Sequence, residues 1–162
     1  MRKQGLLFIT IVLLCLQVSC TVEKECRTEY TACLNVVLEA DSVTRGGETI
    51  RMARLDSVSV QGVGRDTLWM NNQKNVERLG LPLRVDTTCT EYVCTFNSTE
   101  EYLRIYHTNN PHFVSLACGC FMYYTIDSIA CDGYAIDSIE VLNAQIENVS
   151  QDNVRLHIVL KP

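Results

Sequence analysis

Apolar and polar residues alternate along most of this chain, and this alternation constrains its fold more than any other feature. Side chains that alternate at every second residue indicate a strand with one buried face, whereas a helix shows a period near 3.6 residues. About nine such segments follow one another at intervals of roughly ten residues. They cover residues 34–38, 58–60, 68–70, 81–83, 92–96, 103–105, 113–124, 136–142 and 154–160.

Turn-forming residues separate these segments. Glycine, asparagine, aspartate and proline cluster at residues 46–47, 62–66, 71–72, 97–98, 109–111 and 132–133, where they favour tight turns. Short strands joined in this way predict an all-β fold, namely an antiparallel, Ig-like β-sandwich of about nine strands. The chain has 162 residues, of which 47% are hydrophobic, which is enough for one packed core. We predict a single domain over residues 26–162.

The first nineteen residues have the order of a secretory signal peptide. Arg2 and Lys3 precede an apolar run at residues 6–16, which is shorter than the about 20 residues that a spanning helix needs. The residues before Cys20 resemble the bacterial lipobox, although Gln17 stands where an aliphatic residue is usual. We predict a signal peptide over 1–19, a lipid on Cys20 and a tether over 20–25. An ordinary cleaved signal, with Cys20 in a disulfide, is the alternative.

Charge and motifs exclude several function classes. Removing the two basic residues of the leader takes the net charge from −5 to −7, which argues against a nucleic-acid partner. No nucleophile elbow, zinc-protease motif, phosphate loop or dinucleotide fingerprint is present. We predict a non-catalytic binding or structural module without cofactor. The alternatives are an enzyme acting on envelope polysaccharide or peptidoglycan, which needs two carboxylates in a cleft, and a small-ligand carrier, which needs a cavity.

Four segments carry a resemblance to a known family. They are residues 55–64, 81–83, 112–120 and 136–143, and they resemble an uncharacterised family of Bacteroidota envelope lipoproteins, domain of unknown function 6452. The resemblance implies a β-rich lipoprotein in a Gram-negative outer membrane, facing the periplasm or the cell surface. It implies contact with the membrane through the lipid, and another envelope protein or a glycan as partner. It assigns no catalytic residue.

Nine cysteines call for an explanation. Without Cys15 in the leader and a lipidated Cys20, seven remain, and an exported chain uses cysteines mainly in disulfides. Cys118 and Cys120 lie on one predicted strand about 6.6 Å apart, too far to bond to each other. The alternation of buried and exposed positions along their strands places Cys94, Cys118 and Cys120 on the side that faces the core. Partners for Cys118 and Cys120 are sought in Cys26 and Cys33. Parity and the family resemblance together predict Cys26–Cys118, and next Cys33–Cys120.

The same cysteines allow a metal or redox interpretation. Cys118 and Cys120 with His107 and His112 offer zinc ligands, but one glycine inside a strand does not make the tight turn of structural zinc sites. A reactive dithiol needs exposure and a cationic neighbour, which the flanking aromatic residues do not supply. We predict no metal. His107 and His112 flank a predicted turn and His157 lies in the last strand, and we expect such histidines at the surface or rim rather than as catalytic bases.

Six of the eight aspartates precede Ser or Thr and then a small or aliphatic residue or Thr. This triplet resembles the O-glycosylation sequon of exported Bacteroidota proteins, and chance predicts only about 0.5 occurrences in such a composition. Turns ending in Asp before a β-branched strand explain the same triplets without a glycan. Thr67 and Ser138 are the favoured positions because turns precede them. The candidate hydroxyls belong to Ser42, Ser57, Thr67, Thr87, Ser128 and Ser138.

Overall fold

The computed structural model describes residues 32–43, 46–47, 49–52, 55–115 and 119–160, which form strands and no helix. Nothing in this part of the chain is therefore a helix that could cross a membrane. Eleven strands are present: β1 (Cys33–Val43), β2 (Thr49–Met52), β3 (Val58–Gly62), β4 (Leu68–Gln73), β5 (Arg78–Pro82), β6 (Cys89–Phe96), β7 (Thr99–Ser115), β8 (Gly119–Cys131), β9 (Ile136–Val141), β10 (Gln145–Ile146) and β11 (Val154–Leu160).

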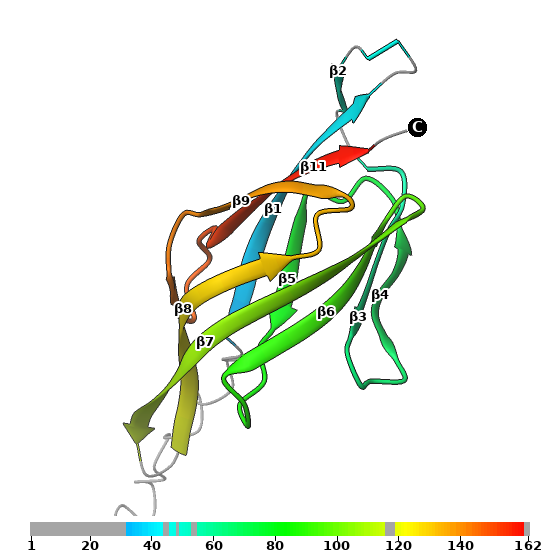
Figure 1. The fold of residues 1–162 in the computed structure, drawn as a ribbon. Helices are drawn as coiled ribbons and strands as arrows, with labels where there is room; N and C mark the ends of the chain where they lie inside the picture. Colours follow the sequence, from blue (N-terminus) through cyan, green and yellow to red (C-terminus); the bar gives the residue numbers. More distant parts are fainter. Residues whose placement is uncertain (1–31, 44–45, 48, 53–54, 116–118, 161–162) are drawn as a thin grey trace, which may run out of the picture.

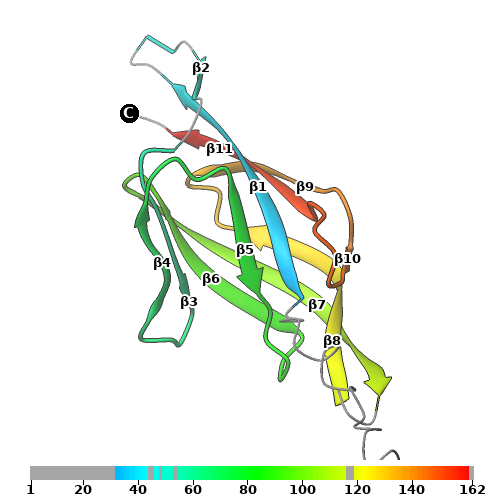
Figure 2. The same ribbon diagram turned by 180° about the vertical axis from the view of Figure 1, so that it is seen from behind.

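Two sheets pack against each other (Figures 1 and 2). The five-stranded sheet has the order β2-β1-β11-β9, with β5 also paired to β1. The six-stranded sheet has the order β10-β8-β7-β6-β3-β4. All pairs are antiparallel except β1 with β11. The predicted all-β sandwich is confirmed, with β2 and β10 added to the predicted strands.

The core lies between the two sheets, and alternate residues of their strands face it, as the sequence predicts. From β1, the side chains of Leu34, Val36, Leu38 and Ala40 are buried, while those between them are half-buried. The opposing sheet contributes alternate residues in the same way, including Val58, Val60, Tyr92, Cys94, Phe96, Leu103 and Ile105. Each large apolar side chain gains about 1.5–3 kcal/mol from burial. The expected core position of Cys94 is confirmed.

The β7–β8 hairpin differs from the prediction in two respects. The predicted turn at residues 109–111 lies within β7, where Asn109 pairs with Tyr124 and Pro111 with Met122. Beyond Tyr106, β8 is the only described strand that pairs with β7. The other edge of β7 is open there, and proline, which has no N–H to donate, is tolerated on such an edge. The predicted single strand over 113–124 is divided between β7 and β8, and its residues 116–118 lie outside the described residues.

The expected core position of Cys120 is wrong, because Cys120 is exposed. It faces Phe113 across the hairpin and follows Gly119, whose φ of 75° is a left-handed conformation that favours glycine. The parity itself is right, since Tyr124 and Ile126 on the same strand are buried. The hairpin, however, extends past the body of the sandwich (Figure 1), so its tip has no opposing sheet to cover it.

A buried carboxylate fixes the connection between β8 and β9. Glu101 on β7 has 0% exposure. Its Oε1 accepts hydrogen bonds from the backbone N–H groups of Asp132 at 2.7 Å and Gly133 at 3.0 Å. Its Oε2 accepts from Ala135 at 2.8 Å and Ile136 at 3.1 Å. Four N–H dipoles thus replace the water that an ionised carboxylate needs.

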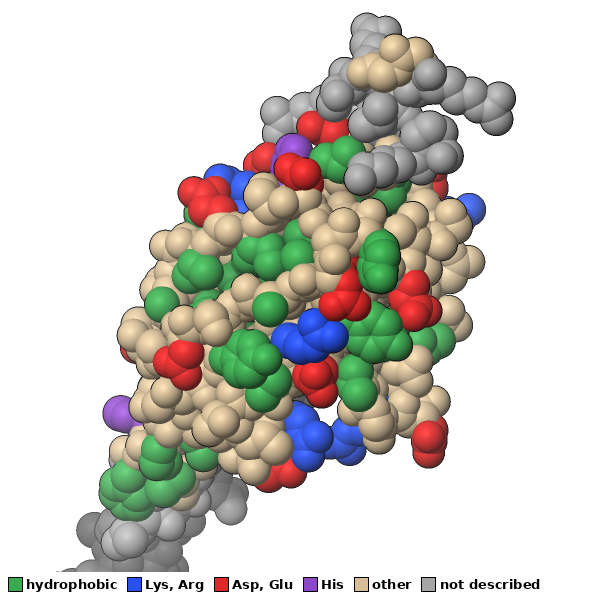
Figure 3. Space-filling model, viewed as in Figure 1, with side chains coloured by type: hydrophobic (Ala, Val, Ile, Leu, Met, Phe, Trp, Pro, Cys, Tyr) green, Lys and Arg blue, Asp and Glu red, His purple; other side chains and the backbone are tan. Residues whose placement is uncertain are grey.

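The outer face of the six-stranded sheet mixes charged and apolar groups (Figure 3). Arg104 on β7 lies 3.4 Å from Glu91 and 3.0 Å from Asp132, and the exposed rings of Tyr102 and Tyr106 flank it along the strand. Each such exposed ion pair contributes about 0–1 kcal/mol. The outer face is therefore stabilised by weak ion pairs that lie among exposed aromatic rings.

Candidate functional site

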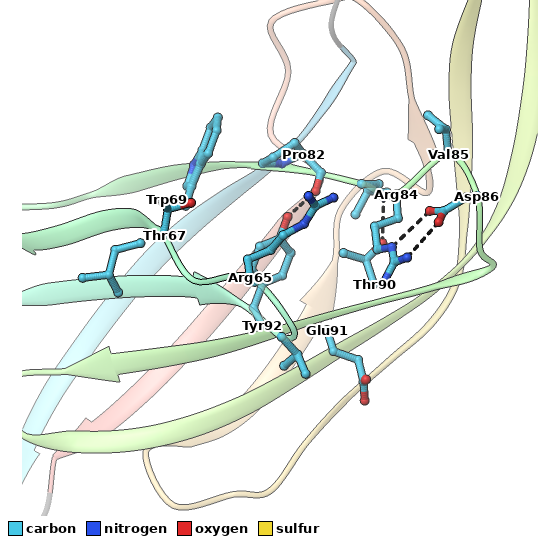
Figure 4. Close-up of a pocket in the computed structure, with 14 residues that line it drawn as sticks. Arg65, Thr67, Trp69, Pro82, Arg84, Val85, Asp86, Thr90, Glu91 and Tyr92 are labelled. Atoms are coloured by element: carbon cyan, nitrogen blue, oxygen red, sulfur yellow. Dashed lines mark hydrogen bonds and ion pairs between the residues drawn. The ribbon is translucent and has the colours of Figure 1, made fainter.

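A pocket of about 420 Å³ opens between the β3–β4 turn and the β5–β6 loop. Figure 4 shows Thr67 and Trp69 on one side, Pro82, Arg84 and Val85 on the other, and Arg65 between them. The two sides belong to different sheets, because β4 is the last strand of the six-stranded sheet and β5 lies on β1 in the other. The pocket thus occupies the seam where the edges of the two sheets meet. Its full lining is Gly62, Val63, Arg65, Thr67, Leu68, Trp69, Pro82, Leu83, Arg84, Val85, Asp86, Thr90, Glu91 and Tyr92.

Trp69 is the only tryptophan of the chain, and 56% of it is exposed. Its indole Nε1–H donates a hydrogen bond of 2.9 Å to the carbonyl oxygen of Gly80. This bond joins β4 to β5 across the seam and restricts the orientation of the ring. A large aromatic surface is therefore held in the open without being part of the core. Exposed apolar surface of this kind, with Val63, Leu68 and Val85 also exposed nearby, marks binding sites.

Two tyrosines from the six-stranded sheet hold the end of β5, and one of them, Tyr92, also lines the pocket. Tyr92 donates a hydrogen bond to the carbonyl oxygen of Pro82, and Tyr124 donates one of 3.2 Å to Leu83. Both rings are buried, and burial raises the pKa of each hydroxyl. The two hydroxyls therefore stay protonated and act as donors at neutral pH. They fix the end of β5, from which the second wall of the pocket continues.

Two arginines, Arg65 and Arg84, supply the positive charges of the pocket lining. Arg84 donates two parallel hydrogen bonds to Asp86, of 3.0 and 2.8 Å, and these hold the pKa of Asp86 below its usual value. Arg65 lies beside Gly62 and Tyr92, since a Cβ added to Gly62 would meet Arg65 Cγ at 3.3 Å. Among the residues that the structure describes, no carboxylate forms an ion pair with Arg65.

A buried histidine supports the loop that forms the second wall. Asn109 donates through Nδ2 to the carbonyl oxygens of Val85 at 3.0 Å and Thr87 at 2.9 Å, so its Oδ1 is free to accept from His107 Nδ1 at 2.7 Å. His107 Nε2 lies 2.8 Å from the hydroxyl of Thr90, which also accepts from the backbone N–H of Arg84 at 2.9 Å. The network is complete when His107 is neutral with its proton on Nδ1.

His107 was expected at the surface, and this expectation is wrong. Its side chain is fully buried, with its ring edge against Tyr124, and burial lowers its pKa. Both ring nitrogens are engaged by Thr90 and Asn109, so neither is available to a metal ion. Within the described ranges, no cluster of three or more His, Cys, Asp or Glu side chains is arranged to hold a metal ion.

Comparison with known proteins gives one family. Residues 57–158 match the model of DUF6452, a family of unknown function. The chain belongs to this family. No curated protein and no solved structure matches it. All residues that line the pocket lie inside the part of the chain that the DUF6452 model covers, whereas β1 lies outside it.

The predicted disulfides of this DUF6452 member fall only partly on described residues. Cys20, Cys26 and Cys118 lie outside them. Cys33 is half-buried and Cys120 exposed, and both carry free thiols in this structure, as do Cys89, Cys94 and Cys131. Ala32, the neighbour of Cys33, lines a second, shallow hollow together with Cys120. The N-terminal end of β1 and the tip of the β7–β8 hairpin are therefore close together.

The glycosylation candidates divide by exposure. Thr67, Ser128 and Ser138 are exposed, and Thr67 lies on the pocket wall. Ser57 and Thr87 are half-buried, and their hydroxyls donate to Asn72 at 2.5 Å and to Cys89 at 2.7 Å. The side chain of Ser42 lies outside the described set. Three of the six hydroxyls are thus accessible without breaking a described hydrogen bond.

Sequence reasoning missed the pocket and the polar networks beneath it. Arg65 lies on the β3–β4 turn, Trp69 on the edge strand β4 and Arg84 on the β5–β6 loop, and only the packing of the two sheets brings Arg84 beside the other two. One signal was available: a lone tryptophan in a short, polar predicted strand is a poor core residue. For Glu101 and His107 the signal was their parity, which places both on the buried face of β7.

Proposed function

We propose that this protein is a lipid-anchored, non-catalytic binding module of a Gram-negative cell envelope. The leader and Cys20 support attachment to a membrane through a lipid, and the family resemblance supports an outer-membrane lipoprotein of Bacteroidota. Three acyl chains on Cys20 supply enough buried CH₂ groups, at about 0.8 kcal/mol each, for stable attachment. The domain is then held near the membrane by the short tether over residues 20–25.

The pocket is the observation that carries the binding role. It joins an exposed, fixed indole, two arginines and exposed aliphatic groups in one opening. Tryptophan and arginine are the residues that most often dominate the energy of binding sites. Its walls are fixed before any ligand arrives, by Tyr92, Tyr124 and the His107 network. Such a site loses little conformational entropy on binding.

The carboxylates of the pocket support binding over hydrolysis. Asp86 is held by Arg84, which lowers its pKa, so it stays ionised and is a poor proton donor. Glu91 lies 3.4 Å from Arg104 on the neighbouring strand. A glycosidase needs one carboxyl that keeps its proton near neutral pH. The carboxylate of Asp86 is instead placed to accept hydrogen bonds from a ligand, whereas the side chain of Glu91 points away from Arg65 and Trp69 (Figure 4).

Site-specific photo-crosslinking in native envelopes tests this role. A photoreactive residue replaces Leu68, which is exposed and lines the pocket, or Val149, which is equally accessible on the loop before β11. Figure 2 shows β4 and β10 at opposite sides of the sandwich, so Val149 serves as the matched control. We expect a discrete envelope adduct from position 68 only. No adduct at 68, or the same adducts at both positions, would contradict the proposal.

A further inference from the structure

One cation of the pocket, Arg65, has no ion-pair partner among the described residues. Arg84 is satisfied by Asp86 through a two-bond contact. Arg65 is exposed and forms no ion pair with a described carboxylate, and its methylene groups pack beside Tyr92 and over Gly62. A guanidinium presented in this way, at the edge of a hydrophobic wall, matches the geometry of a carboxylate. A ligand can therefore supply the ion-pair partner that no described carboxylate gives to Arg65.

The indole of Trp69 provides a flat surface beside this cation. Its Nε1–H is already bound to Gly80, so the ring offers a ligand its π face rather than a hydrogen-bond donor. That face carries partial negative charge and packs well against C–H groups. The C–H face of a sugar ring is flat, apolar and slightly positive, whereas the rim of the same ring carries hydroxyls. An extended peptide has no comparable rigid face.

The acidic groups in the pocket favour a ligand with few charges and many hydroxyls. Asp86 lines it, and its carboxylate has more acceptor positions than Arg84 uses. Sugar hydroxyls are able to donate to these positions. A strongly acidic peptide or a polyphosphate would instead meet the carboxylate of Asp86 on a protein of net charge −5, and like charges within a few ångströms repel.

We infer that the pocket binds a saccharide that carries a carboxylate, such as a uronic or sialic acid. The carboxylate binds Arg65, the ring packs on Trp69, and hydroxyls donate to Asp86. This inference rests on the proposed binding role of the same pocket. It adds the chemical class of the ligand to that role.

The fluorescence of Trp69 reports on this binding directly, because the chain has no other tryptophan. The mature, full-length chain in detergent is titrated with galacturonic acid and with 3′-sialyllactose, each of which carries one carboxylate. Their neutral matches are the methyl ester of galacturonic acid and lactose. We expect a saturable change with both acidic sugars. The neutral matches should bind roughly tenfold more weakly or less, since hydrogen bonds to charged groups contribute about 1.5–3 kcal/mol.

Two variants with equal loss of charge separate the pocket from general electrostatics. Arg65→Met should weaken acidic-sugar binding by roughly tenfold or more, while Lys74→Met, outside the pocket lining, should leave it unchanged. Calorimetric titration of Trp69→Ala, which removes the fluorophore, should show the same loss. Thermal unfolding of each variant confirms that it is folded.

Three results would overturn the inference. These are no binding of either acidic sugar, equal binding of the neutral matches, and unchanged binding by Arg65→Met. The peptide acetyl-Ala-Glu-Ala-amide also carries one carboxylate, and binding of this peptide as tight as that of galacturonic acid would likewise overturn the saccharide class. In each case an adduct at position 68 in native envelopes would leave the binding role standing. Absence of that adduct would remove both.

Discussion

Glu101→Gln is the substitution that most sharply tests how this fold is held together. In the native protein, each carboxylate oxygen of Glu101 accepts two backbone N–H groups from the β8–β9 connection. Glutamine keeps the length and shape of the side chain but replaces one acceptor oxygen by an NH₂ donor. Two backbone N–H groups then face a donor in a site with 0% exposure. Water cannot reach them without opening the turn.

The size of the effect follows from these contacts. Each buried N–H left without an acceptor costs about 1–3 kcal/mol, so two of them cost roughly 2–6 kcal/mol. Removing a buried charge returns part of this, because the charge itself was costly to desolvate. We expect a net destabilisation of about 3 kcal/mol. This is a large share of the roughly 5–15 kcal/mol that stabilises a domain of ordinary size.

Urea unfolding followed by circular dichroism measures this change, with Glu100→Gln as control. Glu100 is the preceding residue on β7 and is exposed, so the same chemical change there should alter stability by less than about 0.5 kcal/mol. The midpoint for Glu101→Gln should fall clearly below both the wild type and the control. Equal midpoints for the two variants would show that the four hydrogen bonds do not stabilise the fold.

Three further predictions concern other parts of the chain. Cys20→Ala should move the protein from the membrane to the soluble fraction, and continued membrane association would refute the lipid anchor. Because burial lowers the pKa of His107 in the folded state, the stability that its neutral form supplies is complete above the unfolded pKa of about 6.5 and is lost as pH falls below it. His107→Gln should therefore reduce the change in the urea midpoint between about pH 7 and pH 5. An unchanged pH dependence of the midpoint would refute this account. Protein from its native envelope should be heavier than protein made in a heterologous cytoplasm, after allowance for lipid and disulfides, and Thr67→Ala with Ser138→Ala should reduce the excess; equal masses would leave only the turn-to-strand explanation of the triplets.

Local patterns predicted the strands well because one face of each sheet is buried. Alternation from Leu34 to Leu38 and from Tyr92 to Phe96 reflects that burial directly. It failed at residues 109–111, where asparagine and proline suggested a turn. There β7 has a partner on only one side among the described strands, so Pro111 is tolerated inside it.

The pocket and the buried networks depend on contacts that local patterns do not contain. Trp69 and Gly80 meet because β4 and β5 end different sheets at the same seam. Glu101 is a charged residue on a buried face, and only its four N–H partners, more than thirty positions along the chain, make that placement favourable. The alternation along β7 puts Glu101 on the buried face, but it does not explain how a charged residue is accommodated there.

The position of the ligand is the central claim, and the indole N–H signal of Trp69 measures it most directly. A ¹⁵N-labelled chain gives a single indole signal, because it has one tryptophan. Titration with the saccharide fraction of the native envelope should shift this signal together with the amides of Gly62 and Val85, which line the same pocket. The amides of the Glu101 turn should stay in place. An unmoved indole signal, with shifts confined to the outer face around Tyr102 and Tyr106, would contradict the account.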